Sequence, residues 1–318
     1  MSGTLAFTQG DDTWHKLRKR VATDPYWFVN AVLNYGTKFP LHEATHKLPL
    51  LFAFRKTGVA ALDNARYQLI LWPRRTGKSS CITIARTLWY AVQNPDTSIM
   101  LANEKAELAA EFLDAIKTHI ETNELLRALY PEVIPEDFSR DWSQTRATLK
   151  RTSARPQPTF FAIGVGGALA GKHPDDIVCD DLISDEAMEN ARSGNWSVMD
   201  RVKRWVNHLE PVLAGDHSHI TWIGTRWWFN DVYDHVVSAF GSGDPVRYRI
   251  SAKLSDGRTV SRPVDLYGDL AVLKISAVEN GTYVFPDIWP QDAIEAEMQR
   301  DPEFASCNLL NDPANAAI

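Results

Sequence analysis

The chain has 318 residues, 44% of them hydrophobic and 23% charged, which is the composition of a globular protein with material for one large or two smaller cores. Its formal net charge of −6 excludes nucleic-acid binding through overall charge, so any such contact would need a local basic patch. No apolar run approaches the roughly 20 residues that span a bilayer, and the polar residues 1–9 lack the apolar segment of a signal peptide. Three scattered cysteines indicate neither a disulfide framework nor a zinc site, which favours a reducing compartment.

The N-terminal segment, residues 1–65, is predicted to be mostly helical because apolar residues recur at helical spacing. The stretch that follows has the order of a strand, a polar loop and a helix. An apolar run from Tyr67 to Trp72 predicts a buried parallel strand, and a helix is predicted to open at Gly77. A phosphate-binding loop requires this order, since the N–H groups of the loop and of the first helical turn point at one spot.

In this interpretation the loop binds a triphosphate. Lys78 would reach the β- and γ-phosphates, and the Ser79 hydroxyl would ligate Mg²⁺. The residues predicted to bind the nucleotide are Arg74, Arg75, Thr76, Gly77, Lys78, Ser79, Ser80 and, from a later strand, Thr225.

The loop motif is incomplete, because Trp72 stands where G-x-x-x-x-G-K-[ST] has its first glycine. An ordinary helix N-terminus with a serine near its cap is the alternative. Arg74 and Arg75 argue against that alternative. They add positive charge where a helix N-terminus is already positive, which is unfavourable unless an anion binds there.

After the loop, the sequence alternates between helical and extended patterns. A helix at 81–92, a strand at 98–102, an amphipathic helix from Glu104 to Ile120 and a strand at 159–165 are predicted. The apolar face of the amphipathic helix is predicted to contain Leu108, Phe112, Ala115 and Ile116. This alternation indicates an α/β fold with a mostly parallel sheet flanked by helices.

Residues 131–172 are less regular and carry a basic cluster in an otherwise acidic chain. The cluster consists of Arg140, Arg146, Lys150, Arg151 and Arg155. A solvated β-hairpin and a surface that contacts phosphate or a neighbouring subunit are equally compatible with this pattern.

Paired carboxylates end the next predicted strand, Asp176 to Asp181. Open α/β sheets bind ligands at the carboxyl ends of their strands, so these side chains are well placed for chemistry. Asp180 can hold Mg²⁺ through water, and Asp181 can polarise the attacking water. A solvated turn is the alternative, because aspartate is common after strands. Lys78 lies far enough upstream to leave room for two strand–helix units, which favours the metal site.

A long helical stretch is predicted at 184–213, followed by a buried strand at 219–224. Thr225 and Arg226 follow this strand and are candidate sensors of hydrolysis, since they would face the γ-phosphate from the side opposite the loop. For Arg226, a salt bridge to Asp231 or Asp234 is the alternative.

Short strands at 247–250, 271–275 and 282–285 predict a small antiparallel lid. The predicted organisation is therefore a helical segment flanking the nucleotide site at 1–65, a core at 66–244, and a lid subdomain at 245–318 with the start of a linker.

Taken together, these motifs resemble the large terminase subunit of tailed bacteriophages, the ATPase that packages DNA into a procapsid. The resemblance covers roughly residues 60–313. It is carried by Pro73–Ser79, Ile177–Asp181 and Ile223–Trp227, with Phe285–Pro286 and Asn311–Pro313 at the end of the ATPase region. It implies a P-loop NTPase core of the additional-strand type with a small lid subdomain, and ATP and Mg²⁺ as ligands.

The resemblance also implies roles for single residues. Lys78 and Ser79 would bind phosphate and Mg²⁺, and Asp180 would ligate the metal through water. Thr225 would lie in the motif that couples hydrolysis to DNA movement. Arg74 matches a position implicated in charge stabilisation in this family.

One departure concerns the catalytic base. Many P-loop ATPases carry Glu after the metal-binding Asp, whereas this chain has Asp181, which is one methylene shorter. Either Asp181 acts through water, or Glu186 or Glu189 supplies the base. The trans-acting arginine of a ring interface is not identified, and Arg140, Arg146 and Arg155 are its candidates.

The implied partners are double-stranded DNA, the small terminase subunit and the portal of the procapsid, in a homo-oligomeric ring in the cytoplasm of an infected bacterial host. The nuclease domain that follows the ATPase in this family is not expected here, so no DNA cleavage is predicted. The alternatives are a helicase-like nucleic-acid-dependent ATPase, and a nucleotide-gated scaffold with little hydrolysis, which the missing Glu after Asp180 keeps open.

Overall fold

The computed structural model describes residues 12–313, so the prediction made for residues 1–9 lies outside the described residues. The strands of its main sheet are β1 (Tyr67–Leu71), β2 (Ile99–Asn103), β3 (Arg146–Ala147), β4 (Phe160–Gly164), β5 (Asp176–Asp180), β6 (His219–Gly224), β7 (Val246–Lys253), β8 (Thr259–Tyr267) and β9 (Leu270–Lys274). They form one nine-stranded sheet in the order β3-β4-β2-β5-β6-β1-β9-β8-β7. The strands from β4 to β9 in this order are all parallel, which confirms the predicted mostly parallel α/β sheet.

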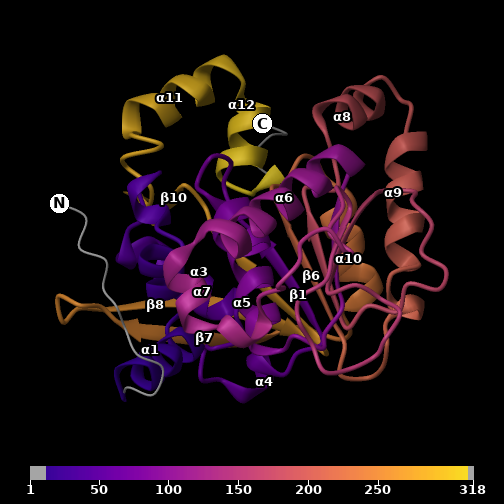
Figure 1. Cartoon of the computed structure of the whole chain (residues 1–318). Coiled ribbons are helices and arrows are strands. Elements are labelled where there is room, and N and C mark those ends of the chain that lie inside the picture. The colour runs from indigo at the N-terminus through magenta and orange to yellow at the C-terminus, as the bar shows by residue number, and fades with distance from the viewer. Residues whose placement is uncertain (1–11, 314–318) are drawn as a thin grey trace.

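Helices cover the sheet and account for most of the remaining chain (Figure 1). The N-terminal ones are α1 (Asp12–Thr23), α2 (Pro25–Trp27), η1 (Phe28–Val32), η2 (Tyr35–Thr37), α3 (Glu43–Ala53) and α4 (Ala60–Asp63). The central ones are η3 (Ser79–Ile84), α5 (Ala85–Gln93), α6 (Ala106–Thr122), α7 (Glu124–Leu129), η4 (Pro131–Val133), α8 (Asp185–Arg192), α9 (Ser197–Asn207), η5 (Glu210–Val212) and α10 (Val232–Phe240). The C-terminal ones are α11 (Gln291–Arg300), α12 (Pro302–Phe304) and η6 (Ala305–Leu309), and a two-stranded sheet of β10 (Val278–Glu279) and β11 (Thr282–Tyr283) precedes them. Within residues 12–313, no helix is both long and apolar enough to cross a membrane.

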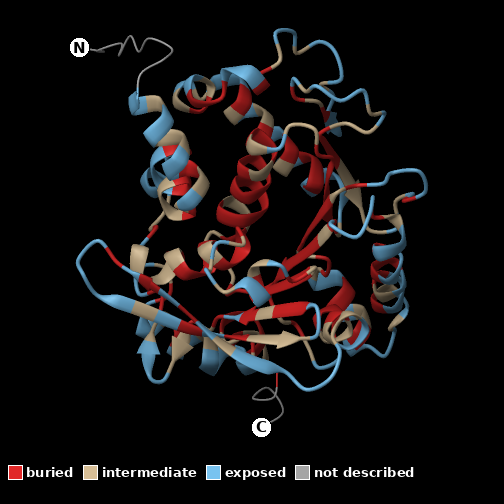
Figure 2. Ribbon diagram, turned by 90° about the horizontal axis from the view of Figure 1, so that it is seen from below, coloured by how far each residue is buried: buried red, intermediate tan, exposed pale blue. Residues whose placement is uncertain are grey.

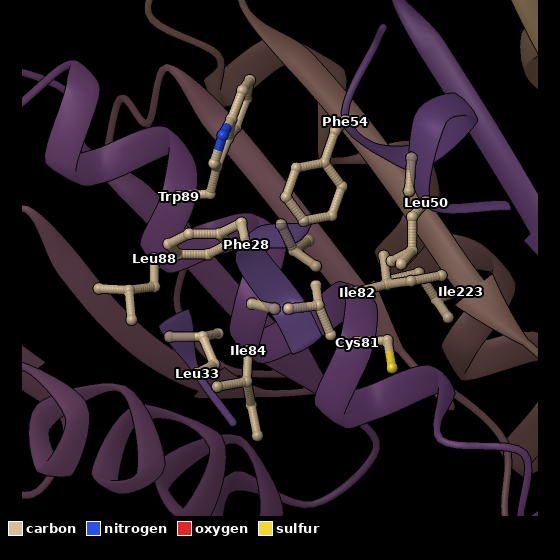
Figure 3. Close-up of a cluster of buried hydrophobic side chains, with 14 of the residues drawn as sticks. Phe28, Leu33, Leu50, Phe54, Cys81, Ile82, Ile84, Leu88, Trp89 and Ile223 are labelled. Atoms are coloured by element: carbon tan, nitrogen blue, oxygen red, sulfur yellow. The ribbon is translucent and has the colours of Figure 1, made fainter. Parts of the chain in front are cut away.

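The two faces of the sheet pack against different sets of helices because side chains alternate along a strand. Ile70 of β1 joins the core beneath the N-terminal helices, η3 and α5, whereas Leu69 and Leu71 join a second core beneath α8, α9 and α10. Figure 3 shows the first core, where Phe28, Phe54 and Trp89 lie close together beside the sheet. Buried residues follow the central strands and the inner sides of the helices (Figure 2). Every strand that leads to the predicted site is therefore held from both sides.

The amphipathic helix after β2 begins later than predicted. It starts at Ala106 instead of Glu104, because the Asn103 side chain accepts the N–H of Lys105 at 3.0 Å and turns the chain before the helix. Leu108, predicted on the apolar face, is 39% exposed. The face that packs on the sheet consists of Ala109, Ala110, Leu113, Ile116 and Ile120.

The prediction of one long helical stretch at 184–213 is also wrong in detail. The stretch is divided into α8, α9 and η5, and the chain turns between the first two at Gly194, where φ is +84°. Glycine adopts this left-handed conformation without the steric cost that other residues incur.

Two of the three strands predicted for the lid extend the main sheet, whereas the one predicted at 282–285 contains β11, which pairs with β10 in a separate sheet. β8, which was not predicted, runs antiparallel to both β7 and β9, and β9 pairs in parallel with β1, with Tyr67 opposite Leu270. The hairpin of β7 and β8 forms one edge of the sheet, and its residues Ile250, Ala252 and Val264 join the first core (Figure 1). The boundary at residue 245 stays a prediction.

A buried ion pair fixes the helix after the loop to the carboxylate strand. Arg86 of α5 is 2% exposed and Asp176 of β5 is fully buried, and two guanidinium nitrogens of Arg86 bond the carboxylate of Asp176. Removing one partner of such a pair would leave an uncompensated charge in the core. This contact therefore fixes α5 relative to β5, the strand that ends at Asp180.

Candidate nucleotide-binding site

The loop after β1 is closed tightly by its own contacts. The Thr76 hydroxyl donates to the carbonyl of Pro73 at 2.7 Å, and Thr76 is fully buried. Arg75 and Gly77 both have left-handed φ values, of +67° and +83°. A Cβ atom added at Gly77 would lie 2.7 Å from the ring of Phe39, so the loop needs glycine there for both its conformation and its packing.

The residue in place of the first motif glycine behaves as a continuation of the strand. The N–H of Trp72 donates to the carbonyl of Gly224 at 2.9 Å, and the Trp72 side chain is fully buried beside His46 and Phe285. The chain leaves the sheet only after this residue. The departure from the motif therefore lies in the strand, outside the closed part of the loop.

The predicted lysine and both predicted aspartates meet at the carboxyl edge of the sheet. Lys78 is 7% exposed, and its Nζ lies 2.7 Å from Oδ2 of Asp181. Asp180 is fully buried, and its Oδ2 accepts the Thr83 hydroxyl at 2.8 Å. Within the described part of the chain, Oδ1 of Asp180 and Oδ1 of Asp181 are buried without a hydrogen-bond partner. A buried acceptor without a partner costs free energy of folding, unless a bound ligand supplies the missing contact.

The protonation of Asp180 reflects this environment. Burial raises the pKa of its carboxyl to about 6, and the adjacent carboxylate of Asp181 raises it too. Lys78 and the hydroxyls of Ser79 and Thr83 oppose the shift, because each favours the ionised form. A cation bound at Asp180 would lower the pKa of this carboxyl, as Lys78 does.

The donor set fits Mg²⁺ better than a metal held by protein ligands alone. Residues 12–313 contain no group of three or more His, Cys, Asp or Glu that could hold a metal ion. Mg²⁺ does not need one, since it usually keeps several waters and binds one or two carboxylates together with substrate phosphates. The unpartnered Oδ1 of Asp180 and the Ser79 hydroxyl, which acts on the same carboxylate, supply such a pair of oxygen ligands.

A third strand reaches the loop through Thr225, directly after β6. This residue is 1% exposed, and its hydroxyl donates to the carbonyl of Trp72 at 3.1 Å. The guanidinium of Arg226 bonds Asp231 at 2.9 Å and Asp234 at 2.6 Å. For Arg226 the salt-bridge alternative is therefore confirmed, and a role as a sensor of hydrolysis stays a prediction.

The two loop arginines contact aromatic rings of neighbouring segments. The guanidinium carbon of Arg74 lies 4.6 Å from the centre of the Trp227 ring, and its Nη1 lies 3.8 Å from Oδ1 of Asp185. The guanidinium of Arg75 lies 5.6 Å from the Trp289 ring. Ring faces attract such cations, so both arginines are held beside the loop at a modest energetic gain.

The glutamates proposed as alternative bases are not brought into contact with Lys78 or the aspartates. Glu186 and Glu189 lie on α8 and are exposed, and none of the side-chain hydrogen bonds or ion pairs found within residues 12–313 involves either of them. The described structure thus shows no contact of Glu186 with the site, and its role as a base stays a prediction. The contact is missing because the helix turns this face toward solvent.

Two residues that the sequence analysis did not single out do reach the site. Asn103, at the end of β2, donates its side-chain N–H to the carbonyl of Asp180 at 2.7 Å. The backbone N–H of Glu104 donates to the carbonyl of Asp181 at 3.3 Å, and its Oε1 accepts the Ser184 hydroxyl at 2.5 Å. Both residues lie at the end of a buried strand, and this same position pointed to Asp180 and Asp181 in the sequence. Glu104 was not considered for the site because the sequence analysis places it in the following helix.

The basic cluster at 131–172 is largely engaged within the chain. Arg146 pairs with Asp141 at 3.3 Å, and Lys150 pairs with Glu136 at 2.6 Å. Two further members, Arg151 and Arg155, bond backbone carbonyls or Asp175. These contacts favour the solvated structural region over a phosphate-contacting surface for four of the five residues, and the choice of a trans-acting arginine stays a prediction.

Comparison with solved structures shows that the chain is similar in shape to a phage protein. That protein is a variant of the large terminase ATPase domain of Thermus phage P74-26, with a TM-score of 0.43 and 13% sequence identity, covering 77% of this chain and 88% of that chain. No family model matches the chain, and no curated protein matches it. The functional argument therefore rests on the chain's own residues.

Proposed function

We propose that this chain is a magnesium-dependent ATPase with a P-loop core of the additional-strand type, in which β6 separates the loop strand β1 from the carboxylate strand β5. One observation carries the proposal. Lys78, the Asp180–Asp181 pair and Thr225 follow three different strands, and their contacts join the three strand ends at one edge of the sheet.

The residues present suggest how a triphosphate would be held. The loop N–H groups and the start of η3 attract anions, and Lys78 would exchange Asp181 for the β- and γ-phosphates. Asp180 and Ser79 would hold Mg²⁺, which would supply positive charge to neutralise the phosphates. A carboxylate at the same edge would then orient the attacking water, and Asp181 is the candidate that the motif itself supplies. Arg74 would have to leave the Trp227 ring to stabilise charge at the phosphates.

For the biological role we propose an ATP-driven motor that packages viral DNA into a procapsid. The order of the three motifs in the sequence supports this role, because together they resemble the large terminase subunit. Double-stranded DNA, the small terminase subunit, the portal and a homo-oligomeric ring are the partners that this role requires. Thr225 would pass the state of the γ-phosphate to the strand end through its bond to Trp72.

The decisive substitution is Lys78→Ala. Loss of the buried ammonium should abolish ATP turnover and weaken the binding of a fluorescent ATP analogue, while circular dichroism stays unchanged. Lys19→Ala is the matched control, because Lys19 is exposed on α1 and its side chain makes no ion pair within residues 12–313. Unchanged turnover in Lys78→Ala would eliminate the phosphate-loop assignment.

Phosphate release with and without duplex DNA separates the proposed motor from its alternatives. Turnover that rises with DNA supports a translocating ATPase, and dependence on procapsids then distinguishes packaging from helicase-like activity. Tight ATP binding with no turnover under any of these conditions, including in the assembled ring, would favour a nucleotide-gated scaffold.

A further inference from the structure

A carboxylate outside both motifs lies at the same edge of the sheet as the aspartates. Glu104 follows β2, which pairs in parallel with β5, so the two strands end side by side. Its backbone N–H bonds the carbonyl of Asp181 at 3.3 Å, and the neighbouring Asn103 bonds the carbonyl of Asp180 at 2.7 Å. Two hydrogen bonds thus fix the chain at Glu104 to the aspartate pair.

We propose that Glu104 is the general base that takes the proton of the attacking water, an assignment that rests on the proposed ATPase function. The side chain is half-buried, and its Oε1 accepts the Ser184 hydroxyl at 2.5 Å. Ser184 also caps α8, where its hydroxyl oxygen accepts the N–H of Ala187 at 3.3 Å, so it is itself held in place. Ser184 is therefore the positioning residue that aims the glutamate.

The motif aspartate is a poorer base because its short side chain and left-handed backbone hold it beside Lys78, with which it is paired until nucleotide displaces it. Oδ2 of Asp181 lies 2.7 Å from the ammonium of Lys78, and φ at Asp181 is +44°, in the left-handed region. Its side chain is one methylene shorter than glutamate, which keeps it near the lysine. Glu104 takes part in no ion pair within residues 12–313, and only one of its oxygens has a described hydrogen-bond partner.

The step that Glu104 would assist is an in-line displacement at phosphorus. The water oxygen forms a bond to the γ-phosphorus, and the bond from that phosphorus to the bridging oxygen breaks. ADP leaves with the electron pair, and the proton of the water passes to a carboxylate oxygen of Glu104. The products are ADP and inorganic phosphate, so no further reactant is needed.

Glu104→Gln tests the role without changing the shape of the side chain, because the amide oxygen can still accept the Ser184 hydroxyl. We expect kcat for ATP to fall on the order of 10²–10⁴-fold, the usual contribution of a general base, with KM within a few-fold. Affinity for a fluorescent ATP analogue and the melting temperature should stay unchanged, which a merely structural role would not predict. Glu107→Gln is the matched control, since Glu107 is exposed in the first turn of α6.

Positioning by Ser184 has its own test. Ser184→Ala should lower kcat by about tenfold or less, because one hydrogen bond to a charged group is lost, and should add no loss in the Glu104→Gln background. Full turnover in Glu104→Gln with loss in Asp181→Asn would overturn the proposal and return the role to Asp181. Lys78→Ala separates the ATPase proposal from the base proposal. If Lys78→Ala still binds and hydrolyses ATP, the assignment of the ATPase site is wrong. If Lys78→Ala is inactive but Glu104→Gln keeps full turnover, only the assignment of Glu104 as the base is refuted.

Discussion

At the residue scale, the most informative side chain is Asp180. It is fully buried, one of its oxygens has no hydrogen-bond partner in the described structure, and burial raises its pKa to about 6. A protein does not gain stability from such a carboxylate by itself, because its charge is removed from water without full compensation. The arrangement is explained if a cation bound during function completes the missing contact.

This pKa predicts how stability depends on pH. The folded chain keeps a proton on Asp180 up to about pH 6, whereas the unfolded chain loses it near the ordinary value of 3.8. The unfolded state therefore binds fewer protons in this range, and the free energy of unfolding falls as pH rises from about 4 to 6, by up to ~3 kcal/mol for this group.

Urea unfolding of the metal-free protein at several pH values, compared with Asp180→Asn, measures this contribution. The asparagine stays neutral, so the difference between the two proteins should grow as pH rises through this window. Mg²⁺ with nucleotide should offset the loss in the wild type only, since it favours the ionised carboxylate. A constant difference between the two proteins from pH 4 to 7 would contradict the assignment.

At the element scale, the strand, loop and helix of the site are set by local backbone requirements. The loop carries left-handed φ values at Arg75 and Gly77, and Phe39 from the N-terminal segment packs directly against Gly77. The glycine is therefore required twice, once for its φ of +83° and once for the close approach of the ring.

Gly58 offers a matched comparison that separates these two requirements. Its φ is +77°, but a Cβ atom added there would meet no atom within 4 Å. Gly58→Ala should cost about 1–2 kcal/mol of stability through φ alone, with nucleotide affinity unchanged. Gly77→Ala should cost more and should also weaken nucleotide binding at least tenfold, because the loop must shift away from Phe39.

Thermal unfolding and titration with a fluorescent ATP analogue measure both effects. Adding Phe39→Ala to Gly77→Ala should recover part of the lost affinity by removing the clash. Equal stability losses at the two glycines, with nucleotide affinity intact in both, would show that the packing of Phe39 does not shape the loop.

At the scale of the whole molecule, the C-terminal segment contacts the loop of the candidate nucleotide site. The indole N–H of Trp289 donates to the carbonyl of Arg74 at 2.8 Å, and the carbonyl of Asn308 accepts the N–H of Arg74 at 3.2 Å. Asn311 accepts the N–H of Arg226 at 2.9 Å and donates to the carbonyl of Ile275 at 2.8 Å. Figure 1 shows α11 and α12 together at one end of the molecule, and the residues that make these contacts lie before α11, in η6 and after η6. Movement of this segment would therefore change the position of the backbone at Arg74.

Trp289→Phe tests this coupling. The phenylalanine keeps a ring beside Arg75 but loses the hydrogen bond to Arg74, so the loop should be less well ordered for binding. A typical hydrogen bond contributes about 0.5–1.5 kcal/mol, so nucleotide affinity should fall by about two- to tenfold with little change in melting temperature. Trp196→Phe is the control, because that residue precedes α9 and has no contact with the loop among the interactions described. Unchanged affinity in Trp289→Phe would show that the loop is anchored independently of the C-terminal segment.

The sequence by itself determined the local part of this site. Apolar runs ending in polar residues predicted β1, β5 and β6 and the positions of Lys78, Asp180 and Thr225, because burial and strand length leave a local pattern. Only the tertiary structure decided which strands lie side by side. It placed β2 and Glu104 next to Asp181, turned Glu186 toward solvent, and brought β9 against β1. Neighbours of this kind depend on the order of strands in the sheet and on contacts between distant segments, and periodicity along the chain carries no record of either.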